Sequence, residues 1–155
     1  MATKQLKILW TLTIASLLVM LIYLASHLNA LMDVDESQVP GCTIVQGRCT
    51  VTLNSGQSVQ LLVSPWPVIA LNPVEFKITS DQMRLSSATL ALTGRNMYMG
   101  IHQYTLTPRP NMAGIGVNGT ISVCTEKIMP WRGRVELETM SGSEQLWFDF
   151  DVRQF

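Results

Sequence analysis

The sequence predicts an all-β domain, an immunoglobulin-like antiparallel β-sandwich, preceded by one N-terminal transmembrane helix. Two observations predict it. Residues 8–28 form an almost uncharged apolar run, and from Gln38 onward short β-rich segments alternate with turn residues. The N-terminal run accounts for much of the hydrophobic fraction of 47%. The 155 residues therefore divide into one membrane span and one domain of modest size.

The apolar run has the length of a membrane span. About 20 helical residues, at a rise of about 1.5 Å each, match the ~30 Å hydrocarbon thickness of a bilayer. Lys4 and Lys7 precede the run, and three acidic residues follow it between positions 33 and 36. The positive-inside bias then places the N-terminus in the cytoplasm and the remaining chain on the opposite side.

The expected organisation has four parts: a cytoplasmic segment 1–7, a transmembrane helix 8–28, a tether 29–40 and an exported sandwich 41–155. A cleaved signal peptide is the alternative for the N-terminus. The apolar run is longer than the usual signal-peptide core of about 7 to 15 residues, and no clean small-x-small site precedes Asp33. Both alternatives export the domain to a compartment where disulfides persist.

Eight segments of the exported part are predicted to be strands. Alternation with a period of two is clearest at the C-terminus, where apolar residues at 146, 148, 150 and 152 alternate with Asp149 and Asp151. The two carboxylates are therefore expected on a solvated face. A small barrel is the alternative architecture. The predicted strands are Cys49–Leu53, Ser58–Val63, Val74–Thr79, Arg84–Leu92, His102–Thr107, Gly116–Cys124, Trp131–Glu138 and Gln145–Val152.

The three cysteines divide into a pair and one remainder. Cys42 and Cys49 flank a short loop containing Gly47, a separation suited to a disulfide in an oxidising compartment. Two reduced thiols without a special role are the alternative. Cys124 is then unpaired, and it is either a buried inert thiol or a metal-binding or redox group.

A short methionine-rich stretch carries the main chemical signal. Met97 and Met99 are two residues apart, so an extended chain presents both thioethers on one face, and His102 follows closely. Thioether and imidazole ligands select copper, Cu(I) above all. The alternative is that the methionines fill the edge of a core, as methionine commonly does.

The same stretch resembles a known family. Met97-Tyr98-Met99-Gly100, a strand ending at Cys124 and a strand led by Trp131 follow the pattern of FixH-like and YtkA-like exported domains. The resemblance implies a sandwich behind a single helix in a bacterial inner membrane, with the domain in the periplasm. It also implies a role in copper handling or in assembling a haem–copper respiratory oxidase, with a respiratory complex or a copper protein as partner.

Carried over by position, the family pattern assigns Met97, Met99 and Cys124 to the copper site. His102 is added because it is close to them in the sequence. Trp131 is expected to pack in the core.

Other functions are poorly supported by the sequence. The net charge of zero and the lack of a Lys/Arg cluster argue against nucleic-acid binding. Cys124 and His102 are the one pair suited to nucleophilic catalysis, and no third group orients them, so no enzymatic activity is expected. A structural zinc site needs four Cys or His ligands in paired spacings, which the domain lacks.

Two hypotheses therefore stand. The first is a membrane-anchored domain that binds copper; the second is a metal-free interaction module that docks on a membrane complex. The copper hypothesis predicts that Met97, Met99 and His102 converge on a partly exposed pocket. The docking hypothesis predicts that the methionine sulfurs are buried among apolar side chains.

Overall fold

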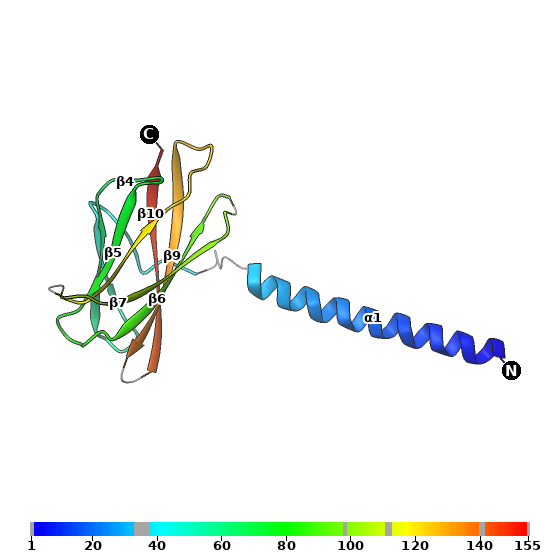
Figure 1. The fold of residues 1–155 in the computed structure, drawn as a ribbon. Coiled ribbons are helices and arrows are strands. Elements are labelled where there is room, and N and C mark those ends of the chain that lie inside the picture. Colours follow the sequence, from blue (N-terminus) through cyan, green and yellow to red (C-terminus); the bar gives the residue numbers. More distant parts are fainter. Residues whose placement is uncertain (1, 33–37, 98, 111–112, 140–141, 155) are drawn as a thin grey trace. The chain divides into compact units, whose positions relative to one another are not determined.

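The computed structural model describes residues 2–32, 38–97, 99–110, 113–139 and 142–154. The chain forms two compact units, Met1–Glu36 and Ser37–Phe155. The first contains the helix α1, Ala2–Met32, and the second contains all the strands of the described residues (Figure 1). Residues 33–37 of the expected tether lie outside the described part of the chain.

The helix α1 has the properties of a membrane anchor. Residues Thr3–Ala25 are long and apolar enough to cross a bilayer. Their large apolar side chains, including Leu9, Leu17 and Ile22, are exposed. An exposed apolar helix of this length is stable in hydrocarbon and unfavourable in water. The prediction of one N-terminal apolar helix ahead of an all-β domain is confirmed.

The described residues of the second unit form ten strands. Eight of them correspond to the predicted segments, and the two additional ones are only two residues long. The strands are β1 (Cys42–Thr43), β2 (Arg48–Thr52), β3 (Ser58–Ser64), β4 (Val68–Ile69), β5 (Pro73–Thr79), β6 (Ser87–Gly94), β7 (Ile101–Pro108), β8 (Ile115–Thr120), β9 (Ile128–Thr139) and β10 (Gly142–Arg153).

The strands form a sandwich with the Greek-key order of immunoglobulin-like domains. One sheet has the order β1, β10, β9, β6 and β7, and the other has the order β8, β5, β3 and β2. From β5 onward, the chain changes sheet between β5 and β6, between β7 and β8, and between β8 and β9 (Figure 1). The end of β7 also pairs with β8, which joins the sheets along one side.

The hydrophobic core lies between the two sheets, and the alternation in the sequence predicted much of it. The alternating apolar residues of β10, from Leu146 to Val152, are all buried, as are Val135 and Leu137 of β9. Leu90 and Leu92 of β6 contribute from the neighbouring strand. The long strands thus bury one face, and burial of apolar area stabilises the sandwich.

A disulfide closes the side of the sandwich opposite to β7. Cys42 lies in β1 at the edge of one sheet, and Cys49 lies in β2 at the edge of the other. The two residues form a disulfide with their Cα atoms 6.1 Å apart. The predicted pairing is confirmed, and it joins the two sheet edges.

The segment between Pro65 and Pro73 differs from the simple exposed connection that its prolines suggest. It contains β4, which pairs in parallel with the end of β10. Val68 and Ala70 are buried in the core. The consecutive strands β3 and β4 thus belong to different sheets: β3 pairs with β5, and β4 pairs with β10.

The prediction that Asp149 lies on a solvated face is wrong. Asp149 is only 7% exposed and Arg132 only 2% exposed. The two residues are directly paired between β10 and β9. Arg132 Nε donates to Asp149 Oδ1 at 2.8 Å, and its Nη2 donates to Oδ2 at 3.0 Å. The alternation correctly places Asp149 on the outer face, but that face is covered here, because Arg132 Nη1 also donates to the Gln38 carbonyl oxygen at 3.0 Å.

Removing the charge of Asp149 should destabilise the domain strongly. Asp149→Asn leaves Arg132 buried without a counter-charge, and breaking such a pair from one side costs about 3 to 5 kcal/mol. We expect a loss of that size in the free energy of unfolding, measured by urea denaturation of the full chain in detergent. Asp151→Asn, at an exposed position of the same strand, is the matched control. Equal stability of the two variants would contradict this account.

Candidate metal centre

Two loops at one end of the sandwich form the candidate site. The first, residues 95–100, connects β6 to β7, and the second, residues 121–127, connects β8 to β9. Gly94 at the end of β6 is paired with Trp131 near the start of β9. The register between these neighbouring strands therefore brings the two loops together.

The 95–100 loop is held at its start by the backbone and by a side chain. The backbone N–H of Arg95 donates to the Pro130 carbonyl oxygen at 3.0 Å. Arg95 Nη1 donates to Asp149 Oδ2 at 2.9 Å, so it shares the carboxylate that binds Arg132. Gly100, with φ of +77°, adopts a left-handed conformation that favours glycine and ends the loop.

The 121–127 loop is anchored at both ends. At its start, Ile121 is buried and its carbonyl oxygen accepts from the Leu71 N–H at 2.9 Å. At its end, the Lys127 carbonyl oxygen accepts from the Gln154 N–H at 3.0 Å. The predicted strand Gly116–Cys124 ends earlier, at Thr120, so Cys124 lies in the loop and not in a strand.

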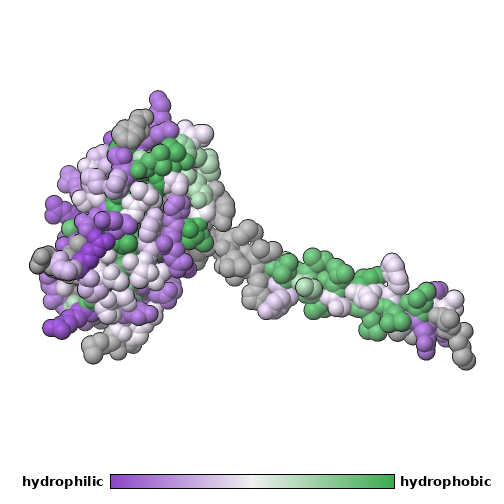
Figure 2. Space-filling view, viewed as in Figure 1, coloured by the Kyte–Doolittle hydropathy of each residue, from purple (hydrophilic) through white to green (hydrophobic). Residues whose placement is uncertain are grey.

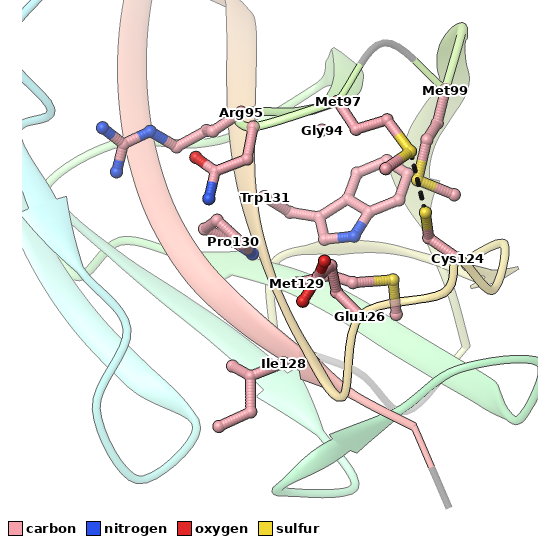
Figure 3. Close-up of a pocket in the computed structure, with 11 residues that line it drawn as sticks. Gly94, Arg95, Met97, Met99, Cys124, Glu126, Ile128, Met129, Pro130 and Trp131 are labelled. Atoms are coloured by element: carbon pink, nitrogen blue, oxygen red, sulfur yellow. Dashed lines mark hydrogen bonds between the residues drawn. The ribbon is translucent and has the colours of Figure 1, made fainter.

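Between these loops is a pocket with a cavity of about 150 Å³. Sulfur-bearing side chains from both loops and from β9 line it: Met97, Met99, Cys124 and Met129. Figure 3 shows the sulfurs of Met97, Met99 and Cys124 close to one another, with that of Met129 beyond Cys124 on the same side of the view. The Trp131 indole lies beside these sulfurs, and Glu126 is also part of the lining.

Two of the sulfurs are in direct contact. The Cys124 thiol donates a hydrogen bond to Met97 Sδ, with the sulfurs 2.8 Å apart. Met97 is 45% exposed, whereas Met99 is partly buried against the core and Met129 is 4% exposed. The cluster thus extends from the protein surface to the core, and its outer member is accessible to solvent.

The structure brings Met97, Met99 and Cys124 together at the pocket, but the predicted convergence of His102 with the two methionines is wrong. His102 does not line the pocket. Its Nε2 lies 3.2 Å from Ser122 Oγ, and its ring packs edge-on against Trp131 with the centroids 5.4 Å apart. A role of His102 as a ligand stays a prediction. In this structure its side chain contacts Trp131, which lines the pocket, and not the sulfurs themselves.

Sequence reasoning missed Met129. It precedes a proline and a tryptophan in a strand, 30 residues beyond Met99, so no local spacing connects it with the methionine stretch. The signal that could have found it was its position two residues before Trp131, because residues i and i+2 of a strand share a face. Both side chains point inward, and both are buried.

The donor set has a clear chemical preference. Among the described residues, no group of three or more His, Cys, Asp or Glu side chains is placed to hold a metal ion. The pocket instead offers thioethers and one thiol, soft donors that select Cu(I) over hard divalent cations. One thiolate would also neutralise the charge of one Cu(I). The residues therefore fit a monovalent soft metal.

Comparison with known proteins does not assign a family. The chain matches no protein-family model, and it matches no curated protein. The resemblance to FixH-like and YtkA-like domains therefore stays a prediction, and the functional argument depends on the site itself.

The geometry of the 95–100 loop can be tested through Gly94. A Cβ atom at this position would lie 2.6 Å from the Met97 carbonyl oxygen, so the loop must shift in Gly94→Ala. We expect the methyl NMR signals of Met97 and Met99 to move in the labelled full chain. Met83, which packs against the core outside the pocket, should keep its signal and serves as the internal control. Unchanged Met97 and Met99 signals would contradict the proposed loop packing.

Proposed function

We propose that this protein is a membrane-anchored, non-enzymatic copper-binding domain that holds Cu(I) between its two sulfur-bearing loops. The observation that carries the proposal is the convergence of Met97, Met99, Cys124 and Met129 on one partly open pocket. These residues are separated by up to 32 positions in the sequence, from 97 to 129. Their convergence therefore depends on the fold and not on a single Met-rich segment.

The mixed exposure of the ligands suits a site that acquires and releases its metal. Met97 at the surface can exchange partners with an incoming copper donor or acceptor, whereas Met129 is held in the core. Thioethers are neutral and bind Cu(I) reversibly, and the thiolate supplies the charge that a monovalent ion needs. In this proposal copper is the cargo that the domain carries, and it does not act as a catalyst.

The cellular setting belongs to the same proposal. The charges around α1 support a cytoplasmic N-terminus, and the Cys42–Cys49 disulfide supports an oxidising compartment for the sandwich. We place the domain in the periplasm, anchored to a bacterial inner membrane. Copper delivery during assembly of a haem–copper oxidase is the process we propose, and its support is the resemblance of the motif around Met97-Tyr98-Met99-Gly100.

The metal-free docking module is the second candidate, and one observation favours it. Apolar side chains are exposed on the loops and strand ends around the pocket, namely Ile101, Val123 and Ile128. Figure 2 shows hydrophobic surface at the end of the domain where β9 begins. The docking hypothesis expects the methionine sulfurs to be buried, whereas Met97 is partly exposed, as expected for copper binding. Metal titration separates the two candidates.

The decisive experiment is an anaerobic Cu(I) titration of the full chain in detergent against a competing chelator. We expect the wild type to bind one Cu(I) per chain. Two variants remove ligands: the double variant Met97→Leu/Met99→Leu and the single variant Cys124→Ser. Loss of a residue behind a metal ligand lowers metal affinity about 10- to 100-fold, and we expect each of these variants to lower Cu(I) affinity by more than that. Leucine keeps the volume of methionine and removes the sulfur.

Met83→Leu is the matched control, because it removes a partly buried methionine sulfur outside the pocket. It should bind Cu(I) like the wild type. Failure of the wild-type chain to compete with the chelator would exclude the copper proposal and leave the docking module.

A further inference from the structure

The buried indole of Trp131 has an unused hydrogen-bond donor. Its side chain is 0% exposed, and it lines the pocket together with the four sulfur-bearing residues. Within the described part of the chain, its Nε1–H has no hydrogen-bond partner. An unsatisfied buried N–H costs about 1 to 3 kcal/mol, and such groups are rare in folded proteins. A donor left open at a binding pocket points to an acceptor that forms when the ligand binds.

The indole nitrogen faces the pocket. In Figure 3 the N–H edge of Trp131 is turned toward the space between Cys124, Glu126 and Met129, and its six-membered ring lies beside the Met97 and Met99 side chains. The donor therefore faces the part of the pocket that Cys124, Glu126 and Met129 line.

Of the acceptors near this edge, the sulfur of Cys124 is the one that changes on metal binding. In the structure its S–H donates to Met97 Sδ, and a neutral thiol is a weak acceptor. When Cu(I) binds, the S–H bond breaks, the proton goes to solvent, and the sulfur electron pair forms the Cu–S bond. The sulfur then carries negative charge, and hydrogen bonds to charged acceptors are the strong ones.

We propose that Trp131 is a positioning residue of the metal site, whose indole N–H donates a hydrogen bond to Cys124 Sγ in the metal-bound state. This inference rests on the proposed copper function and adds the group that stabilises the thiolate. Residues behind metal ligands commonly fix ligand orientation in this way. Trp131 is suited to it because the register between β9 and β6 holds its backbone beside Gly94.

The other polar groups near the pocket are weaker candidates for this hydrogen bond. The guanidinium of Arg95 is bound to Asp149, and Figure 3 shows it extending away from the sulfurs. Ser122 contacts His102. Thr125 Oγ1 lies 3.8 Å from Cys124 Sγ, at the long end for a hydrogen bond to sulfur. Figure 3 shows the Glu126 carboxylate beside the indole nitrogen, but the two form no hydrogen bond, and Glu126 is exposed, so water competes for its carboxylate.

The test is an NMR titration of the full chain in detergent micelles, with ¹⁵N-labelled tryptophan and methyl-labelled methionine. Ag(I) is the probe, because it is soft, monovalent and stable in air. We expect the Trp131 indole N–H signal to move downfield on addition of Ag(I), while the Trp66 and Trp147 signals, which belong to residues outside the pocket, stay in place. In Cys124→Ser the Trp131 signal should stay in place.

Three other results of this titration would contradict the proposal, each in a different way. If the Met97 and Met99 methyl signals respond to Ag(I) but the Trp131 N–H does not, the metal site stands and the role of Trp131 is wrong. If the Trp131 signal moves equally in Cys124→Ser, its acceptor is not the thiolate. If no methionine signal responds, the copper proposal fails and this inference fails with it.

A second variant separates the hydrogen bond from core packing. Replacing Trp131 by its benzothiophene analogue keeps the ring shape and replaces the N–H by sulfur. We expect Cu(I) affinity to fall about 10- to 100-fold while the thermal unfolding temperature is retained. The same analogue at Trp147, outside the pocket, is the control. Unchanged Cu(I) affinity of the Trp131 variant would overturn the proposal.

Discussion

The buried ion pair between Arg132 and Asp149 is the interaction on which the position of the site depends. Desolvating two charges is costly, and the cost is offset here by two charge-assisted hydrogen bonds in a bidentate arrangement. The same carboxylate binds Arg95 at the start of the 95–100 loop, and the same guanidinium binds the carbonyl oxygen of Gln38. One contact thus connects β9, β10, the first residues of the domain and the loop that carries the thioethers.

The site combines this fixed support with an accessible surface. Trp131 is fully buried behind the sulfurs, and Met129 is held in the core, whereas Met97 is close to half exposed. Metal ligands supported by packed residues keep their orientation while an outer ligand remains free to exchange. Under the proposed copper function, this division of roles favours transfer of the metal ion over permanent structural binding.

Much of the fold could be predicted because its signals are local. The apolar run of α1, the alternation of β10 and the spacing of Cys42 and Cys49 each depend on neighbouring residues. The burial of Asp149 could not be predicted, because it depends on which residue faces it across β9 and on a segment 94 positions away from Arg132 that covers it. Met129 and the open N–H of Trp131 were missed for the same reason, since strand register brings them to the 95–100 loop.

The central claim is that the sulfur cluster at the end of the sandwich is a Cu(I) site. X-ray absorption spectroscopy of the full chain loaded with one equivalent of Cu(I) tests it most directly, because this method identifies the atoms bound to the metal. The account predicts a first shell of sulfur atoms that loses sulfur in Met97→Leu/Met99→Leu. A shell of nitrogen and oxygen, unchanged in that variant, would contradict it.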